Sequence, residues 1–174
     1  IGQSTDTICP YAMLRYVCAI ANGGTLIEPH MISGEEPVTA ALIEPATAKQ
    51  LTQMMNYNVV DHYDGDVNFP GLKLCAKTGT AELGDGDSHS WFVGFLADDE
   101  HPYAFVTLVE RGGYGITVAG AVTNDFLQWA VENIEETNTD IRNAEMIDIS
   151  VSSLVKSFEL GKNILDGLSF TVNS

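Results

Sequence analysis

The residues with the clearest chemical potential are Lys77-Thr78-Gly79-Thr80, near the middle of the chain. The lysine adds positive electrostatic potential, and the hydroxyl groups on either side of the glycine can hydrogen-bond a carboxylate. The glycine lets the backbone of a ligand come close, because it has no Cβ to hold the ligand away. The backbone N–H that follows the glycine could point at a developing oxyanion. These four residues therefore predict a strand edge that binds a carboxylate and stabilises negative charge.

A sheet must position these residues, and the surrounding sequence predicts one. Turn-forming residues separate three candidate strands, at residues 72–80, 90–97 and 103–110, so that the Lys-Thr-Gly-Thr segment ends the first of them. The two connections between the strands are short enough for antiparallel pairing. Residues 91–97 are apolar at both odd and even positions, which is typical of a central strand covered on both faces.

Helices are predicted before and after this meander. The first begins with Thr7 as N-cap and Pro10 in the first turn, and it stops at Asn22-Gly23-Gly24; the second begins at Pro45, and the third covers residues 117–133. The residues predicted to face the core are Leu14, Val17, Cys18 and Ala21 in the first helix, Leu51, Met54, Met55 and Val59 in the second, and Val118, Val122, Phe126 and Trp129 in the third. The pattern predicts an α+β fold, with an antiparallel sheet covered by helices.

The charge of the chain limits its partners. There are 8 Lys and Arg residues against 24 Asp and Glu residues, for a formal net charge of −16. This field repels phosphate backbones, and no basic cluster offsets it, so nucleic acid is not expected as a partner. No stretch approaches the roughly 18 apolar residues of a membrane span.

Metal ions and cofactors are not expected either. The four histidines (His30, His62, His89 and His101) lie far apart in the sequence, whereas a zinc site needs converging ligands. The acidic groups at residues 61–66 and 85–87 lack the ligand pattern of a calcium loop, so they are interpreted as solvated turns.

Cysteine usage is also uninformative about chemistry. Cys9, Cys18 and Cys75 are odd in number and show no Cys-x-x-Cys pattern, so burial as small apolar residues is expected rather than a disulfide framework. Cys75 alternates to the same strand face as Lys77 and could be reactive.

The residues around Lys77–Thr80 closely resemble a known family, the class B penicillin-binding proteins. Several motifs occur in family order across residues 2–134, with Ser4 departing from the family's usual Gly-Gln-Gly. These motifs are Gly2-Gln3 with Pro10, Ala21-Asn22-Gly23-Gly24 with Glu28-Pro29-His30, residues 76–82, residues 90–95, and residues 106–110 followed by Gly112-Gly113. The Lys-Thr-Gly segment itself is one of three sequence motifs of penicillin-binding proteins and related β-lactamases.

The resemblance implies a serine D,D-transpeptidase. Such an enzyme cross-links peptidoglycan stem peptides that end in D-Ala-D-Ala, and the reaction passes through an acyl-serine intermediate. β-Lactams acylate the same serine. By the same resemblance, Lys77 and Thr80 are catalytic: Lys77 supplies electrostatic support, and the Thr80 amide contributes to the oxyanion hole. Thr78, Gly79 and Thr80 bind the substrate, with both threonine hydroxyls on the terminal carboxylate. The parent protein is expected at the outer face of the bacterial cytoplasmic membrane, held by an N-terminal membrane anchor, whereas this chain is expected to be soluble.

No nucleophile is predicted in this chain. The family's Ser-x-x-Lys motif should precede residue 1, and Ser-x-Asn does not occur in the chain. Ser153-Leu154-Val155-Lys156 has the right spacing, but it follows Lys77, and so short a pattern arises easily by chance. The chain alone is therefore expected to be a fragment without activity.

Three other functions share this strand and stay open. The chain could belong to a penicillin-sensing receptor domain, to a D,D-carboxypeptidase or β-lactamase-like hydrolase, or to a non-catalytic homologue. Residues 1–134 are predicted to form the C-terminal part of the transpeptidase domain. Residues 135–174 follow as a polar linker and a small appended tail, with alternating apolar runs at 147–151 and 168–172 and a short helix at 152–160 between them.

Overall fold

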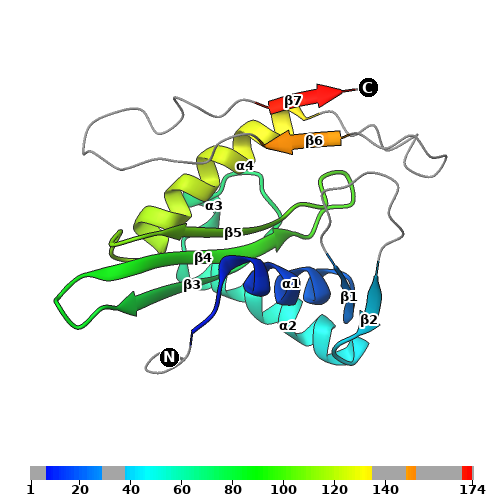
Figure 1. Ribbon diagram of the computed structural model, residues 1–174, viewed down its shortest axis with the longest axis horizontal. Helices are drawn as coiled ribbons and strands as arrows, with labels where there is room; N and C mark the ends of the chain where they lie inside the picture. The colour runs from blue at the N-terminus through cyan, green and yellow to red at the C-terminus, as the bar shows by residue number, and fades with distance from the viewer. Residues whose placement is uncertain (1–6, 29–37, 135–147, 152–169, 174) are drawn as a thin grey trace. The chain divides into compact units, whose positions relative to one another are not determined.

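A computed structural model describes residues 7–28, 38–134, 148–151 and 170–173 of this chain (Figure 1). The described residues divide into two units. The larger unit contains residues 7–28 and 38–134, and the smaller contains β6 (Asp148–Val151) and β7 (Phe170–Asn173). β6 and β7 pair antiparallel with each other, and they lie in the two alternating runs of the tail. The helix predicted at residues 152–160 lies outside the described residues.

An antiparallel sheet in the larger unit carries the Lys-Thr-Gly-Thr segment. Its strand order is β3 (Leu74–Glu82), β4 (Ser88–Leu96) and β5 (Ala104–Val109). The three predicted strands are confirmed, but β3 continues two residues beyond Thr80, because the tight turn that closes the hairpin begins only at Leu83, whose N–H bonds the carbonyl of Asp87 at 2.9 Å. Lys77–Thr80 therefore lies inside β3 rather than at its end, paired in register with residues 90–93 of β4.

The first helix, α1 (Pro10–Ala21), leads into a small hairpin of β1 (Thr25–Ile27) and β2 (Thr39–Ala41). Its N-cap is Cys9, which makes no side-chain capping bond, so the prediction of Thr7 as N-cap is wrong. Pro10 occupies the first turn, where a missing N–H costs nothing. The chain leaves the helix through Gly24, which has a φ of +102° and leaves no room for a Cβ beside the carbonyl of Ile43.

The remaining helices flank the sheet strands in the sequence. α2 (Pro45–Tyr57) runs directly into a π-helical turn, η1 (Asn58–His62), and is followed by the short α3 (Gly65–Asn68). After β5, a second π-helical turn, η2 (Ile116–Gly120), continues into α4 (Ala121–Asn133). Within the residues that the structure describes, none of the helices is long and apolar enough to cross a lipid bilayer.

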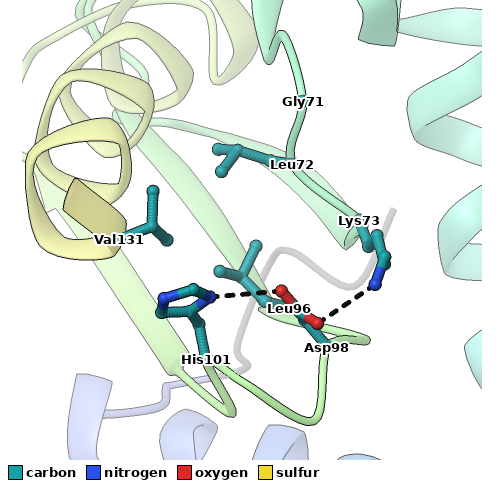
Figure 2. A pocket seen from close by; sticks show the side chains of 7 residues that line it. All are labelled: Gly71, Leu72, Lys73, Leu96, Asp98, His101 and Val131. Atoms are coloured by element: carbon teal, nitrogen blue, oxygen red, sulfur yellow. Dashed lines mark hydrogen bonds and ion pairs between the residues drawn. The ribbon is translucent and has the colours of Figure 1, made fainter. Parts of the chain in front are cut away.

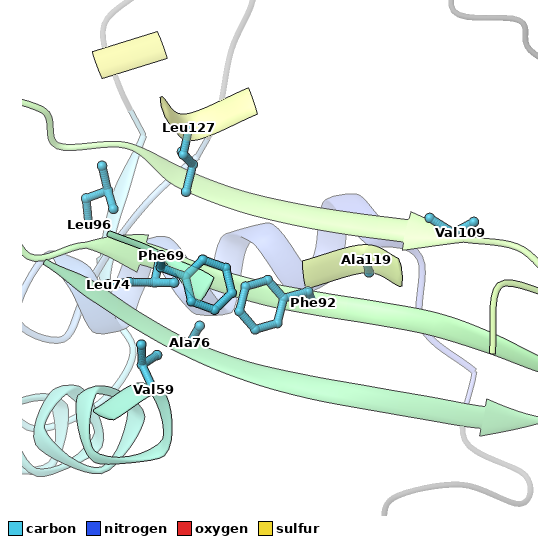
Figure 3. Close-up of a cluster of buried hydrophobic side chains, with 9 residues drawn as sticks. All are labelled: Val59, Phe69, Leu74, Ala76, Phe92, Leu96, Val109, Ala119 and Leu127. Carbon is cyan, nitrogen blue, oxygen red and sulfur yellow. The ribbon is translucent and has the colours of Figure 1, made fainter. Parts of the chain in front are cut away.

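Helices cover both faces of the sheet, as the α+β prediction requires. On the face that we call the α4 face, Phe92 is fully buried and stacks on Phe69, with ring centroids 5.4 Å apart (Figure 3). This cluster comprises Val59, Phe69, Leu74, Ala76, Phe92, Leu96, Val109, Ala119 and Leu127. On the opposite face, the α1 face, a smaller cluster joins Cys75 and Phe95 to Val17 of α1 and Met55 of α2.

The helix predicted at residues 117–133 forms η2 and α4 in the structure, and its buried face differs from the predicted one by a single position. The predicted residues were Val118, Val122, Phe126 and Trp129, whereas the buried ones are Ala119, Thr123, Leu127 and Ala130. Phe126 and Trp129 are 45% and 47% exposed and pack against each other. The pattern favoured large aromatic side chains, but the side chains that are buried are smaller ones. Thr123 can be buried because its hydroxyl bonds both Thr107 and the Ala119 carbonyl, each at 2.7 Å.

The first two helices follow their predictions more closely. Val17, Met55 and Val59 are buried as expected, whereas Ala21 and Met54 are exposed, the latter to 64%. Leu14, Cys18 and Leu51 are half-buried. Two alanines that the apolar stripes did not include, Ala19 and Ala48, are completely buried.

Candidate functional site: the free edge of β3

The edge of β3 exposes backbone groups at the predicted site. Among the described strands, β3 pairs with β4 on one side and has no strand on the other. The N–H of Thr78 donates to the hydroxyl of Tyr63 at 3.2 Å, and its carbonyl accepts from Lys77 Nζ at 2.9 Å. Both backbone groups of Thr78 therefore point away from β4. Because strand geometry repeats every two residues, the N–H and C=O of Thr80 point to the same free edge.

The side chains of the four predicted residues lie on two faces of β3. Thr78 and Thr80 share the α4 face with Phe92 and Ser90, their partners on β4. Lys77 and Gly79 lie on the α1 face, so alternation separates the lysine from the two hydroxyls. The exposed Lys77 side chain bends around the strand and donates to the carbonyl of Thr78. This bond brings the ammonium back to the free edge. The ammonium therefore lies at the free edge, whereas the two threonine side chains lie on the α4 face of the same strand.

Gly79 lies where β3 and β4 are in close contact. A Cβ at this position would be 3.2 Å from the Cβ of Trp91, which is tighter than ordinary van der Waals contact. The glycine thus keeps the α1 face flat beside the lysine.

The hydroxyl of Thr80 is held by a neighbouring turn. The N–H of Gly115 donates to Thr80 Oγ1 at 3.3 Å. A hydroxyl that accepts this bond keeps its own proton for another acceptor, such as a ligand carboxylate. Gly115 is buried, and a Cβ there would be 2.6 Å from the Trp91 carbonyl oxygen and 2.7 Å from that of Gly79. Only glycine fits so closely behind the two strands.

A buried serine fixes this turn to the sheet. The hydroxyl of Ser90 is fully buried and donates to the Tyr114 carbonyl at 3.0 Å. The same oxygen accepts from the N–H of Ala119 at 3.0 Å. Ser90 therefore ties β4 to the start of η2 and, through Gly115, sets the position of the Thr80 hydroxyl.

Sequence reasoning missed the residues that support the site: Tyr63, Ser90 in this role, and Gly115. Their contacts join positions 15 to 35 residues apart in the chain. No local spacing or periodicity indicates such contacts. The Gly112-Gly113 exit from β5 indicated a turn near the site, but not which residue of the turn contacts β3.

The turn beyond the site carries an ion-pair cluster. Arg111 pairs with Asp85 at 3.0 Å and with Asp87. The pKa of Asp85 is lowered, first by the backbone N–H of Asp87 and then by Arg111. These two aspartates are exposed, but they are paired rather than simply solvated as predicted. Arg111 itself has a φ of +52°, and its N–H donates to the ring of His89.

A second polar group lies at the opposite end of β3. Asp98 accepts from Lys73 at 3.1 Å and contacts His101 at 3.2 Å, beside a hollow of about 160 Å³ (Figure 2). The pKa of Asp98 is lowered, with the Lys73 bond as the largest cause and His101 as the second. The hollow is lined by Gly71, Leu72, Lys73, Leu96, Asp98, His101 and Val131. None of the four predicted site residues lies there.

Two further predictions concern residues outside this edge. Cys75 lies on the α1 face with Lys77, as predicted, but it is buried beneath α1 and α2, and burial raises the pKa of its thiol to about 11. A reactive role for Cys75 is therefore not supported. The expectation of burial is wrong for Cys9, which is exposed.

Ser153 lies outside the described residues. Among the described ones, no group of three or more His, Cys, Asp or Glu could hold a metal ion.

Comparison with known proteins gives one consistent result. Residues 1–128 match the family described as the penicillin binding protein transpeptidase domain. The peptidoglycan D,D-transpeptidase PbpA of Mycobacterium tuberculosis is 28% identical over 137 residues, a match that covers 69% of this chain and 28% of PbpA. The chain thus spans less than a third of this relative.

Solved structures show the same fold. Penicillin-binding protein A from M. tuberculosis, solved as a ceftriaxone acyl-enzyme complex, is similar with a TM-score of 0.64 and 25% identity over 74% of this chain and 33% of that one. Penicillin-binding protein PBP2 from Helicobacter pylori has a TM-score of 0.61 and 28% identity, covering 77% of this chain and 26% of PBP2.

Proposed function

This chain belongs to the penicillin-binding protein transpeptidase family, and from that membership we propose that it forms the carboxylate-binding part of a peptidoglycan D,D-transpeptidase that β-lactams acylate. The observation that carries the proposal is the free edge of β3, where the Lys77 ammonium and the backbone of Thr80 lie beside two threonine hydroxyls on the α4 face of the same strand. Such an edge can pair with an extended peptide and bind the carboxylate at its end.

Each residue of the edge has a role in this proposal. The hydroxyls of Thr78 and Thr80 donate to the terminal carboxylate of a D-Ala-D-Ala stem peptide or to the carboxylate of a β-lactam. Lys77 leaves the Thr78 carbonyl and supplies positive potential to the same region. Gly79 lets the ligand backbone approach the strand. The N–H of Thr80, which points to the free edge, donates to the oxyanion that forms at the attacked carbonyl.

The nucleophile comes from another part of the protein in this proposal. A serine in a Ser-x-x-Lys motif attacks the carbonyl, the terminal D-Ala leaves with its amine protonated, and the acyl-serine then passes to an acceptor amine. The chain spans 28% of PbpA, so a longer polypeptide can supply this motif and the Ser-x-Asn motif. Since peptidoglycan lies outside the cytoplasmic membrane, we place the whole protein at the outer face of that membrane, held by an anchor.

Intact-mass spectrometry after incubation with penicillin G tests the proposal. We expect the longer polypeptide, in which this chain follows its Ser-x-x-Lys segment, to gain the mass of one penicillin, and this chain alone to gain none. An adduct on the chain alone would contradict the assignment of the nucleophile, and peptide mapping would show whether Ser153 carries it. A longer polypeptide that gains no mass would contradict the proposed function.

The role of Lys77 is tested with a matched lysine. In the longer polypeptide, Lys77→Met removes the ammonium from the free edge, and we expect the acylation rate to fall by about 10²-fold. Lys73→Met is the control: Lys73 precedes β3, about 13 Å from Lys77 along the strand, and pairs with Asp98. Its acylation rate should stay within about twofold of wild type on the usual scale of surface changes. Equal losses in both variants would contradict a specific role for Lys77.

The lifetime of the acyl-enzyme distinguishes the alternatives. A transpeptidase keeps the penicilloyl group because water is poorly activated at its serine, and so the adduct should persist after free penicillin is removed. Rapid return of the unmodified mass would instead indicate a β-lactamase-like hydrolase. A stable adduct without cross-linking of stem peptides to an acceptor amine would indicate a penicillin-sensing domain.

A further inference from the structure

Tyr63 makes the most specific side-chain contact with the free edge of β3. It follows η1 and precedes α3, and its half-buried ring packs edge-on against Phe92, with centroids 6.1 Å apart and an interplanar angle of 68°. Its own carbonyl accepts from Asn68 Nδ2 at 2.6 Å. The tyrosine is therefore fixed at both its backbone and its ring, and its hydroxyl is held at one place on the strand.

That hydroxyl contacts two groups of a single residue. It accepts from the Thr78 N–H at 3.2 Å and lies 3.1 Å from Thr78 Oγ1. A phenol has one proton and two acceptor positions. The N–H takes one acceptor position, so two arrangements remain for the pair of hydroxyls: Tyr63 donates to Thr78, or Thr78 donates to Tyr63.

A bound carboxylate selects between these arrangements. A carboxylate can only accept, so Thr78 can bind it only with its own proton. This requires Tyr63 to donate to Thr78 Oγ1, which leaves the threonine proton free for the ligand. Charge-assisted bonds of this kind are stronger than neutral ones, so the ligand itself favours this arrangement.

The same contact closes the strand edge at Thr78. Its N–H is already bonded to Tyr63, so a ligand strand that pairs with the N–H and C=O of Thr80 has no free donor two residues earlier. Exposed strand edges otherwise pair with any extended chain.

We propose that Tyr63 is a positioning residue of the ligand site: its hydroxyl ends strand addition at Thr78 and directs the Thr78 hydroxyl proton to the ligand carboxylate. This inference rests on the proposed function, because it concerns the same edge. The class of ligand is an extended peptide or peptide mimic with a free carboxylate beside the reacting carbonyl.

The test is Tyr63→Phe in the longer polypeptide, with Tyr57→Phe as control, since the Tyr57 side chain is 55% exposed and its ring packs on His62. Amide hydrogen exchange at Thr78 should be at least about tenfold faster in Tyr63→Phe and unchanged in Tyr57→Phe. Acylation by penicillin G should fall about tenfold, as expected when one bond supporting a charged group is lost, whereas acylation by its methyl ester should hardly change.

A double-mutant cycle separates positioning from a general loss of structure. In the background of Thr78→Val, Tyr63→Phe should cause no further loss of acylation rate, because the hydroxyl that it positions is absent. Unchanged Thr78 exchange, or equal losses with penicillin G and its ester, would overturn the inference. Wild-type protein that takes up no penicillin would contradict the proposed function, and hydrogen exchange at Thr78 would then decide whether Tyr63 closes the edge.

Discussion

At the scale of single residues, the turn at Gly115 packs against β3 and β4 so closely that it leaves no room for a side chain. Replacing Gly115 with alanine would put a Cβ within 2.7 Å of two carbonyl oxygens, so the turn must move away from β3. We expect Gly115→Ala to lower the free energy of unfolding by about 1–3 kcal/mol, as overpacking does. It should also slow acylation of the longer polypeptide, because Thr80 Oγ1 loses its donor.

Denaturant unfolding and acylation by penicillin G measure these two effects. Tyr114→Ala is the matched control, because that side chain is 75% exposed and only its carbonyl binds Ser90. A surface change of this kind should stay within about 0.5 kcal/mol of wild type. If Gly115→Ala is as stable and as reactive as this control, the turn can accommodate a Cβ without loss of stability or acylation rate, which would contradict the prediction.

Cysteine labelling gives a second prediction at this scale. The thiol of Cys75 has a pKa raised to about 11 by burial, and Cys9 is exposed. Since the thiolate is the reactive form, iodoacetamide near pH 8 should modify Cys9 rapidly and leave Cys75 unmodified in the folded protein. Peptide mapping measures both sites, and guanidinium chloride should make all three cysteines react. Equal rates at Cys9 and Cys75 without denaturant would contradict the burial of Cys75.

The site itself could be predicted only in part from the sequence. Lys77 and Thr80 could be proposed as site residues because their types and spacing are local. Tyr63 and Gly115 were not, because their contacts with Thr78 and Thr80 exist only after the chain has folded. Strand alternation also shows why the lysine and the hydroxyls lie on different faces, and the bend of the Lys77 side chain brings its ammonium to the free edge.

At the scale of elements, close contact between β3 and β4 depends on Gly94. A Cβ there would be 2.3 Å from the Cys75 carbonyl oxygen and 2.9 Å from the Cα of Ala76. We expect Gly94→Ala to destabilise the protein by about 1–3 kcal/mol, because the two strands must separate. Gly79→Ala offers a graded comparison, since its Cβ would be 3.2 Å from that of Trp91. Denaturant unfolding should show a smaller loss for Gly79→Ala, and the reverse order would contradict this account.

The elements were more predictable than the faces that they bury. Turns and helix ends are encoded by neighbouring residues, so the three strands and three long helices could be placed from turns, prolines and glycines, although the N-cap of α1 is Cys9 rather than Thr7. The buried face of α4 could not, because it depends on how near the helix comes to the sheet. The residues that α4 buries are Thr123, Leu127 and Ala130, whereas Phe126 and Trp129 are nearly half-exposed.

At the scale of the whole molecule, pH acts through ion pairs at both ends of β3. The pKa values of Asp98 and Asp85 are lowered in the folded protein. A lowered value means that the folded state binds fewer protons, so this stabilisation is complete above the ordinary value near 3.8 and is lost as the pH falls through the folded value. The net charge of −16 acts in the opposite direction, because its self-repulsion weakens in acid.

The variant Asp98→Asn separates these two effects. At neutral pH we expect it to unfold at a lower temperature than wild type, because Lys73 and His101 lose their partner. The difference in midpoint should stay nearly constant down to the ordinary Asp value near 3.8 and shrink only below it, as the pH falls through the lowered pKa of the folded protein and the wild-type carboxylate becomes protonated. Thermal unfolding by circular dichroism at several pH values measures this, and a difference that grows in acid would contradict the lowered pKa.

In the proposed function, the helices on both faces of the sheet also limit which ligands the protein can distinguish. With α1 on one face and α4 on the other, an extended peptide of the proposed class would have to approach β3 along its edge, where it would meet mainly backbone groups and two hydroxyls. Such an edge reads the main chain and terminal charge of its ligand and largely ignores its side chains. One binding strand can therefore serve chemically different compounds, provided that each presents an amide and a carboxylate at the same spacing.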